Sequence, residues 1–220
     1  MKPEIIHTAD GSPTLYIPEL NEQYHSVNGA LTESNYVYLE KGYSFHTSAN
    51  PVVFEVGFGT GLNALITAIH AEKTCRPTVY VTMEKFPLEN YYYIKLNYGV
   101  LFNERGAELY RLLHQAPWGV EVQITPFFRL LKIYEDFTGL EWHLPHFCDI
   151  IFFDAFGPDK QPEMWLEQNF LRIYSFTSPG GILVTYSAKG EVRRRMISAG
   201  FTIEKLPGPP GKKEMLRGIK

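Results

Sequence analysis

An α/β fold with a mostly parallel sheet is predicted by three features of the sequence. From Pro51 onwards, short apolar runs alternate with segments whose apolar residues recur at helical spacing. A glycine-rich turn follows the first of these runs, and residues rich in Pro and Gly separate the last two candidate strands. Because alternating strands and helices produce a parallel sheet, we expect one sheet with helices on both of its faces.

The elements follow in order along the chain. Short alternating segments at 14–17 and 36–39 predict strands within an aromatic, turn-rich start, so we expect 1–50 to form a small β-rich extension and 51–220 the main domain. The main domain is expected to hold a seven-stranded sheet. Its strands are expected at 52–56, 78–83, 120–124, 149–153 and 182–186, with a closing hairpin of 201–206 and 214–217. Helices are expected near 62–69, 87–98, from 127, from 162 and over 190–199.

Composition limits the class of protein. The 220 residues, 45% of them hydrophobic, suit one α/β domain with a modest extension. No apolar run is long enough to span a bilayer and the chain opens without a signal sequence, so we expect a cytoplasmic protein with no membrane partner. Cys75 and Cys148 stand far apart, as is usual in the cytoplasm. His143, His146 and Cys148 match no standard metal-ligand spacing, so no metal is expected.

A glycine-rich loop, Gly57-Phe58-Gly59-Thr60-Gly61, lies between a predicted strand and a predicted helix, two residues after Glu55. Glycines allow a tight turn and a close approach of ligand, and the helix start offers free N–H groups. The G-x-G-x-G spacing differs from the G-x-G-x-x-G of dinucleotide sites. It favours S-adenosylmethionine, which has no pyrophosphate. A purely structural turn is the alternative.

Glu84 ends the second predicted strand, where its carboxylate could accept hydrogen bonds from both ribose hydroxyls of a nucleoside. A surface glutamate paired with Lys85 is the alternative interpretation. Together, the loop and this acid favour a nucleoside cofactor.

Asp154 ends the most hydrophobic predicted strand and is followed by Ala155-Phe156-Gly157-Pro158. Ligands of doubly wound sheets bind beyond the carboxyl ends of central strands, and a buried acid there costs free energy unless it is hydrogen-bonded or functional. We therefore expect Asp154 to be catalytic, orienting an attacking amine and taking its proton. Phe156 would stack on a base or form a wall of the pocket. Asp154 capping the next helix is the alternative.

The C-terminal part of the chain is basic, although the net charge of the whole is −3. Residues 189–220 contain nine Lys and Arg and three Glu, a net charge of +6, which leaves −9 for the rest. This asymmetry predicts a basic face that binds phosphates. The alternative is that 193–195 form the solvated side of a helix. The candidate phosphate-binding residues are Lys189, Arg193, Arg194, Lys212 and Lys213.

Several motifs together support a family resemblance. The most specific are Glu84-Lys85-Phe86-Pro87-Leu88 and Pro162-Glu163-Met164-Trp165. They are accompanied by Asp10-Gly11-Ser12-Pro13, Asn28-Gly29 with Glu33 and Tyr36, Gly57 to Asn63, Asp154 to Gln161, Val192-Arg193-Arg194, Ala199-Gly200-Phe201 and Gly211 to Leu216. Over nearly its whole length the chain resembles the methyltransferase domain of the MnmC family, bacterial tRNA wobble-uridine enzymes that include stand-alone forms.

The resemblance implies a Rossmann-like class I methyltransferase that uses S-adenosylmethionine. Its implied reaction is N-methylation of the 5-aminomethyl group of (2-thio)uridine at the tRNA wobble position, giving 5-methylaminomethyl(-2-thio)uridine. In two-domain relatives an FAD-dependent oxidase domain makes this amine, so we expect a separate enzyme to supply it here. The expected cofactor-binding residues are Glu55, Gly57, Phe58, Gly59, Gly61, Asn63, Glu84, Lys85 and Asp154, with Tyr24 from the extension.

The chain departs from the family pattern at one place. The family carries Gly-Asp after the third strand to bind the adenine amino group, whereas the matching stretch here is Thr125-Pro126. Either backbone groups and Phe127 hold the adenine, or the third strand lies elsewhere. Three rival functions stay open: an amine methyltransferase acting on a small molecule or protein, a non-catalytic cofactor- or RNA-binding protein, and an NAD-dependent dehydrogenase. The glycine spacing disfavours the last of these.

Overall fold

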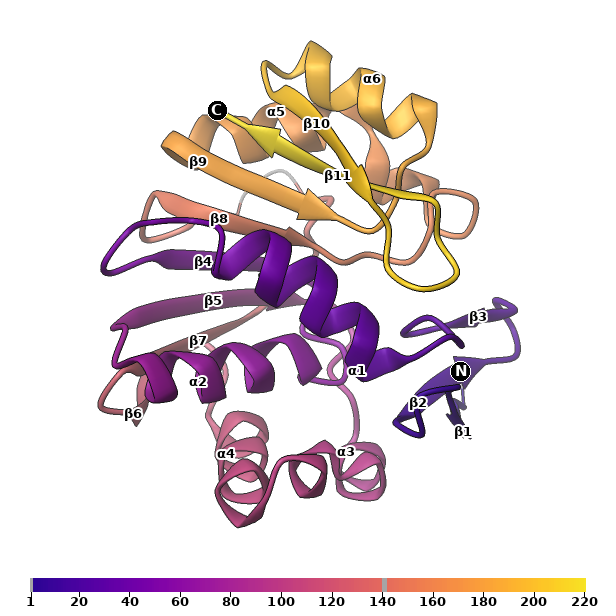
Figure 1. The fold of residues 1–220 in the computed structure, drawn as a ribbon, viewed down its shortest axis with the longest axis vertical. Coiled ribbons are helices and arrows are strands. Elements are labelled where there is room, and N and C mark those ends of the chain that lie inside the picture. The colour runs from indigo at the N-terminus through magenta and orange to yellow at the C-terminus, as the bar shows by residue number, and fades with distance from the viewer. Residues whose placement is uncertain (1, 140–141) are drawn as a thin grey trace.

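The computed structural model describes residues 2–139 and 142–220. Within them, eight strands form one sheet in the order β10-β11-β9-β8-β4-β5-β7-β6, and three more form a small antiparallel sheet (Figure 1). Strands β4, β5, β7, β8 and β9 run parallel, while β6, β10 and β11 are antiparallel. The strands are β1 (Glu4–His7), β2 (Pro13–Ile17), β3 (Glu22–Gln23), β4 (Val52–Val56), β5 (Thr78–Glu84), β6 (Glu121–Thr125), β7 (Phe128–Tyr134), β8 (Cys148–Phe153), β9 (Thr177–Thr185), β10 (Thr202–Pro207) and β11 (Glu214–Ile219). The predicted Rossmann-like fold and the closing hairpin are confirmed.

Helices cover both faces of the large sheet. One face carries η1, α2 and α4, whereas α5 and α6 lie on the other (Figure 1). Two apolar clusters fill the layers between sheet and helices, one containing Tyr38 and Leu65 and the other Phe170 and Met196. The helices are α1 (Ala30–Glu33), η1 (Ser34–Tyr43), α2 (Leu62–Thr74), α3 (Asn90–Leu96), η2 (Tyr98–Leu101), α4 (Glu104–Gln115), η3 (Pro162–Trp165), α5 (Glu167–Phe176) and α6 (Gly190–Ser198). None of the helices in the described ranges is both long and apolar enough to cross a membrane.

The strand predicted at 36–39 is wrong, because this segment belongs to the helix η1, which is wound as a π-helix. Its buried residues are Ser34, Val37, Tyr38, Gly42 and Tyr43. Spacings of three and four place them on one face of a helix. A window of four residues was too short to separate this pattern from strand alternation.

The helix predicted from residue 127 is also wrong. Phe128–Tyr134 is β7, the parallel neighbour of β5, and Glu121–Thr125 is the antiparallel edge strand β6 rather than a parallel third strand. The extra strand makes eight instead of seven. Phe128, Leu130 and Lys132 are the buried residues of β7. Because a lysine occupies the third buried position, the apolar alternation of this strand is interrupted in the sequence.

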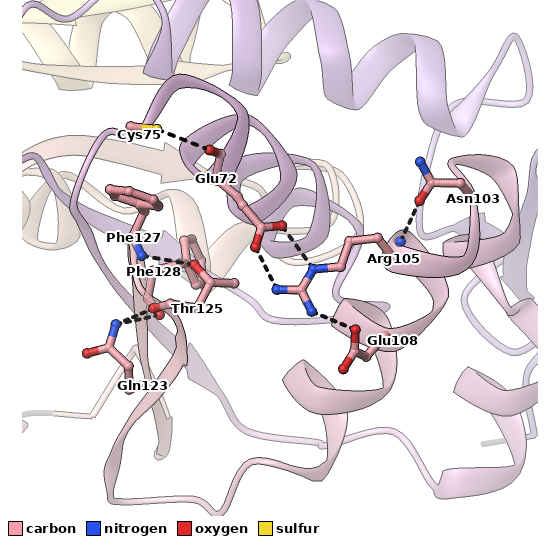
Figure 2. Close-up of polar contacts among 10 residues, drawn as sticks. Glu72, Cys75, Asn103, Arg105, Glu108, Gln123, Thr125, Phe127 and Phe128 are labelled. Carbon is pink, nitrogen blue, oxygen red and sulfur yellow. Dashed lines mark hydrogen bonds and ion pairs between the residues drawn. The ribbon is translucent and has the colours of Figure 1, made fainter.

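The turn between β6 and β7 lies far from the cleft described below. Thr125 Oγ1 accepts a hydrogen bond from the Phe127 N–H at 3.1 Å, which tightens this turn (Figure 2). Phe128 pairs with Thr78 at the start of β5, whereas Tyr134 pairs with Glu84 at its end. Thr125-Pro126 therefore does not correspond to the expected adenine-binding position.

The helix α4, which was not anticipated, is fixed to α2 by an ion-pair bridge. Arg105 contacts Glu72 at 2.6 Å and Glu108 at 2.6 Å (Figure 2). The side chain of Asn103 caps the helix start by accepting a hydrogen bond from the Gly106 N–H at 3.0 Å. This arrangement brings the C-terminal turn of α4 against the glycine-rich loop.

Candidate functional site

A cleft of about 360 Å³ lies at the carboxyl ends of β4, β5, β7 and β8. Its wall includes the glycine-rich loop, the end of β5 with Glu84, the segment after β7 with Asp136, and the start of the segment after β8 with Asp154. The N-terminal segment adds Tyr24 and His25. Figure 1 shows the small sheet β1-β2-β3 beside this end of the parallel strands. The predicted position of the site is the one that the topology of parallel sheets favours.

The glycine-rich loop needs its glycines. Gly57, Gly59 and Gly61 all have positive φ, at 89°, 49° and 74°, which other residues rarely adopt. A Cβ atom at Gly61 would also lie 2.9 Å from His114 Nε2, and one at Gly59 would lie 3.3 Å from the Tyr24 ring. The backbone therefore passes close to its neighbours, and no side chain projects from these three positions into the cleft.

Helix α4 holds this loop through one carbonyl. The Thr60 oxygen accepts a hydrogen bond from the Tyr110 hydroxyl at 2.9 Å and lies 3.1 Å from His114 Nε2. The His114 ring stacks on Tyr93 with centroids 4.2 Å apart. Burial lowers the pKa of His114 to about 3, so the ring is neutral and can donate from Nε2 to this carbonyl. Phe58, at the first turn of the loop, packs against the same imidazole.

Glu84 is fixed by two backbone donors. Its Oε2 accepts a hydrogen bond from the Gly59 N–H at 3.0 Å, and its Oε1 accepts one from the Phe86 N–H at 2.7 Å. Each carboxylate oxygen keeps one acceptor position, as two neighbouring ribose hydroxyls require. The alternative pairing of Glu84 with Lys85 is not what the structure shows, because Lys85 Nζ lies 2.6 Å from Asp136 Oδ2.

The acid that the sequence analysis did not locate is Asp136, with Glu135 beside it. Both follow β7 directly and line the cleft with Phe137 and Thr138. Burial acts to raise the pKa of Asp136, but hydrogen bonds from Lys85 and Thr138 lower it overall. Asp136 therefore carries a negative charge and can accept a hydrogen bond from an exocyclic amino group. Asp136, and not Thr125-Pro126, is therefore the acid that follows the strand beside β5 and lines the cleft.

Asp154, half-buried at the other end of the cleft, accepts a hydrogen bond at each oxygen. The Tyr38 hydroxyl donates to Oδ1 at 2.6 Å, and Asn63 Nδ2 donates to Oδ2 at 2.7 Å. Burial raises the pKa of Asp154 to about 6, against the effect of these two bonds. The group is thus a carboxylate at neutral pH, close to the pH at which it can exchange a proton.

Two of the expected cofactor-binding residues, Asn63 and Glu55, lie near Asp154. Asn63 lines the cleft, whereas Glu55 is only 1% exposed and is not part of the cleft wall. Burial raises the pKa of Glu55 well above its usual value, and the charge of Asp154 adds to the effect. Glu55 is therefore a neutral acid beneath the glycine-rich loop. Its Oε2 and the Asn63 Oδ1 have no hydrogen-bond partner among the residues that the structure describes.

Two aromatic residues of the cleft wall, Tyr24 and Phe156, contact each other. The Tyr24 and Phe156 rings are 5.0 Å apart at an angle of 80°, and both line the cleft. Ile17, Leu20 and Met164 also line it. Tyr24 is brought to Phe156 from the N-terminal segment, and burial together with the charge of Glu84 raises the pKa of the Tyr24 phenol.

Two of the five predicted phosphate-binding residues have internal partners. Lys189 pairs with Asp159, and Lys212 pairs with Glu33. The Lys212 ammonium also lies 3.9 Å from the centre of the Tyr186 ring. No carboxylate of the described ranges lies within 4.0 Å of the basic groups of Arg193, Arg194 and Lys213. The charge available to a polyanion is therefore smaller than the sequence indicates.

The cleft fits S-adenosylmethionine. Glu84 can hold the ribose hydroxyls, Asp136 the adenine amino group, and the glycine-rich loop leaves space free of side chains beside them. The far end of the cleft is lined by Asp154 and Phe156. Across residues 2–139 and 142–220, no cluster of three or more His, Cys, Asp or Glu side chains is arranged to hold a metal ion.

Comparisons with known proteins agree with this geometry. Residues 130–220 match a family described as S-adenosyl-L-methionine-dependent methyltransferase. The fold matches MNMC2 from Aquifex aeolicus with a TM-score of 0.79 and 25% identity, over 99% of this chain and 70% of that one. Two more distant matches show the fold alone. Spermidine synthase from Thermotoga maritima has a TM-score of 0.53 and 9% identity, over 100% of this chain and 79% of that one. DesVI from Streptomyces venezuelae has a TM-score of 0.51 and 11% identity, over 86% and 91%.

These findings confirm the predicted fold, the resemblance to the MnmC methyltransferase domain and the predicted cofactor.

Proposed function

We propose that this S-adenosylmethionine-dependent methyltransferase methylates the primary amine of 5-aminomethyl(-2-thio)uridine at the wobble position of tRNA, producing the 5-methylaminomethyl nucleoside. The observation that carries the proposal is the acceptor end of the cleft. A carboxylate held by two neutral donors, Asp154, stands there beside the aromatic ring of Phe156. This combination suits an amine attached to a planar base. The similarity to MNMC2 along 99% of the chain supports the same reaction.

Asp154 is suited to receive the proton that the amine must lose. An alkylamine has a pKa well above 7 and reaches the site as an ammonium ion, which cannot attack. The Asp154 carboxylate, with a pKa of about 6, attracts this ion and accepts one of its protons once the amine is positioned. Each oxygen uses one acceptor position for Tyr38 or Asn63 and has another for the amine.

When bound, S-adenosylmethionine would supply an electrophilic methyl group on a sulfonium sulfur, and Glu84 and Asp136 would hold its nucleoside part. The protein's contribution is mainly alignment, which can supply up to about 7–11 kcal/mol of the barrier in favourable cases. Glu84 and Asp136 fix one end of the cleft, and Asp154 with Phe156 fixes the other. The fixed distance between these two ends sets the alignment of nitrogen and methyl carbon.

The tRNA backbone would be contacted by Arg193, Arg194 and Lys213, which have no carboxylate partner among the described residues. Arg193 is on α6 and Lys213 on the β10–β11 loop, and both act on the pKa of Glu214, so the two elements form one surface. Arg194 follows on the same helix. With three such contacts, tRNA affinity would fall as salt is added, and a plot of log binding constant against log salt concentration would have a slope of about −2 to −3.

The amine substrate would come from a separate enzyme, since 5-aminomethyluridine has to be made before it is methylated. We place both reactions in the cytoplasm. The two free cysteines, Cys75 and Cys148, are consistent with a reducing compartment.

The test is to incubate the protein with methyl-labelled S-adenosylmethionine and tRNA bearing 5-aminomethyluridine, then digest the tRNA and separate its nucleosides. Label in 5-methylaminomethyluridine is the expected result. Retained cofactor binding with no labelled nucleoside would contradict the proposed substrate. Unmodified tRNA of the same sequence is the control and should remain unlabelled.

A second candidate is an amine methyltransferase that acts on a small molecule or a protein. It is favoured by the internal pairing of Lys189 and Lys212, which reduces the surface available for tRNA. The dependence of activity on salt concentration distinguishes the two candidate functions. Activity on a small amine should change little between 50 and 200 mM salt, whereas tRNA binding should weaken by roughly one to two orders of magnitude for the slope given above.

A further inference from the structure

We propose that Tyr38 is a positioning residue of the methyl-transfer reaction: its hydroxyl holds the Asp154 carboxylate in the orientation that meets the acceptor amine. The inference rests on the role of Asp154 in the proposed function. It makes the N-terminal segment, which supplies η1, a part of the catalytic machinery.

Two hydrogen-bond donors hold the Asp154 carboxylate, one at each oxygen. Tyr38 Oη lies 2.6 Å from Oδ1, and Asn63 Nδ2 lies 2.7 Å from Oδ2. Tyr38 is on η1 and Asn63 is on α2, so the two donors approach from different elements. With one donor fixed at each oxygen, rotation of the carboxylate about its Cβ–Cγ bond would break both bonds. The remaining acceptor positions therefore keep one direction.

Tyr38 is well suited to stay in place and to stay a donor. It is 1% exposed and packs against Phe152 of β8 with ring centres 5.3 Å apart. Burial raises the pKa of its phenol well above the usual value, and the charge of Asp154 adds to this. The hydroxyl thus keeps its proton and donates a hydrogen bond to the carboxylate at every pH at which the protein works.

Charged and titratable groups face Asp154 from each neighbouring element. Glu33 on α1 raises its pKa and Lys212 on the β10–β11 loop lowers it, and these two residues are paired with each other. Glu55 on β4 and Tyr186 after β9 are neutral, because burial raises the pKa of each. Tyr38 is therefore the principal donor that opposes the effect of burial on this carboxylate. Its removal should raise the pKa of Asp154.

The chain offers a matched control for this test. Tyr43 is on the same helix, is fully buried, and makes a hydrogen bond of the same 2.6 Å length, but to Thr78 Oγ1 at the start of β5. Tyr38→Phe and Tyr43→Phe thus remove the same atom from equally buried places. Only the first of these atoms contacts Asp154.

The experiment measures the Asp154 carboxyl directly, by its ¹³Cγ chemical shift between pH 4 and 9, with Asp154→Asn used to assign the signal. We expect Tyr38→Phe to raise the midpoint by about one unit, since a hydrogen bond to a charged group contributes about that much. The acid limb of kcat against pH should move with it. At pH 7 this shift alone lowers the ionised fraction of Asp154 about twofold, and the lost orientation of the carboxylate should bring the fall in kcat to about 10-fold, while the cofactor Kd stays constant. Tyr43→Phe should change neither the midpoint nor the pH profile.

A midpoint and pH profile unchanged in Tyr38→Phe would overturn the inference, as would the same shift in Tyr43→Phe. If Tyr38→Phe does not fold, 3-fluorotyrosine at position 38 retains the hydroxyl and makes it a stronger donor, so the midpoint should fall instead of rise. A constant midpoint in that variant would also overturn the inference. The carboxyl titration needs no tRNA, so a failure of the proposed substrate would show in the nucleoside assay and leave this result distinct.

Discussion

The two ends of the cleft are built differently. The end assigned to the nucleoside uses residues at the carboxyl ends of strands of the main sheet: Glu84 is the last residue of β5, and Asp136 lies two residues beyond the end of β7. The acceptor end combines Asp154 after β8 with Tyr38 from the N-terminal segment. The side chains proposed to bind the cofactor are thus positioned by the main sheet alone. The side chains proposed to bind the acceptor depend also on how the first fifty residues pack against that sheet. The difference predicts that substitutions at the two ends affect different constants.

The largest effect is expected at the acceptor end. Asp154→Asn keeps the size of the side chain but removes the proton acceptor, so kcat at pH 7 should fall by about 10²–10⁴. The cofactor Kd, measured by calorimetry, should change less than about threefold, because an amide can still bond to Asn63. Asp159→Asn, in the segment after Asp154 and paired with Lys189, is the control and should retain activity. If Asp154→Asn lowered the cofactor affinity as much as kcat, the two ends of the cleft would not have separate roles in binding the cofactor and the acceptor.

A smaller effect is expected at the nucleoside end, and there the cofactor affinity should change rather than kcat. Asp136→Asn should weaken the cofactor about 10-fold, because it loses a charged acceptor, while kcat at saturating cofactor is kept. Thr125→Ala is the matched test of the strand register, since Thr125 lies in the β6–β7 turn at the other end of β7 (Figure 2). It should leave the cofactor Kd unchanged. A weaker cofactor affinity in Thr125→Ala, with an unchanged affinity in Asp136→Asn, would show that Thr125-Pro126 contacts the adenine.

The smallest effect is expected outside the cleft wall, at the buried Glu55. Because the buried carboxyl is neutral, Glu55→Gln replaces it with a neutral group of equal size and should change the free energy of unfolding by less than about 1 kcal/mol. Glu55→Ala would leave a cavity and should cost about 2 kcal/mol or more. Loss of cofactor binding in Glu55→Gln alone would show that this residue acts as a charge in the site. Denaturant unfolding and calorimetry measure the two quantities.

Sequence reasoning was most successful where function depends on neighbours along the chain. The glycine-rich loop, Glu84 and Asp154 each follow a strand that its apolar residues identify, and the topology of a parallel sheet brings them to one edge. Asp136 was missed because a buried lysine, Lys132, interrupts the alternation of β7. Burial lowers the pKa of this lysine to about 8, and its ammonium is kept between the Phe58 and Trp118 rings and the His114 carbonyl.

Long-range contacts explain the other differences. Tyr38 was placed on a strand and given no role, since only its contact with Asp154, 116 residues away, shows what its hydroxyl does. Lys212 was predicted to bind phosphate, and its pairing with Glu33 across 179 residues is equally invisible in the sequence. Composition gives the number of charges, but only the packing of the segments shows which charges compensate one another.

The most direct test of the account is the pH dependence of single-turnover methyl transfer by the wild-type protein and by Asp154→Asn, on tRNA bearing 5-aminomethyluridine. The wild-type rate should be constant above about pH 6, where the Asp154 carboxylate is ionised and takes the proton of the bound ammonium, and it should fall tenfold per unit below that pH. The Asp154→Asn rate should instead rise with pH through the pKa of the amine itself. Equal rates for the two proteins at every pH would contradict a role of Asp154 as the proton acceptor.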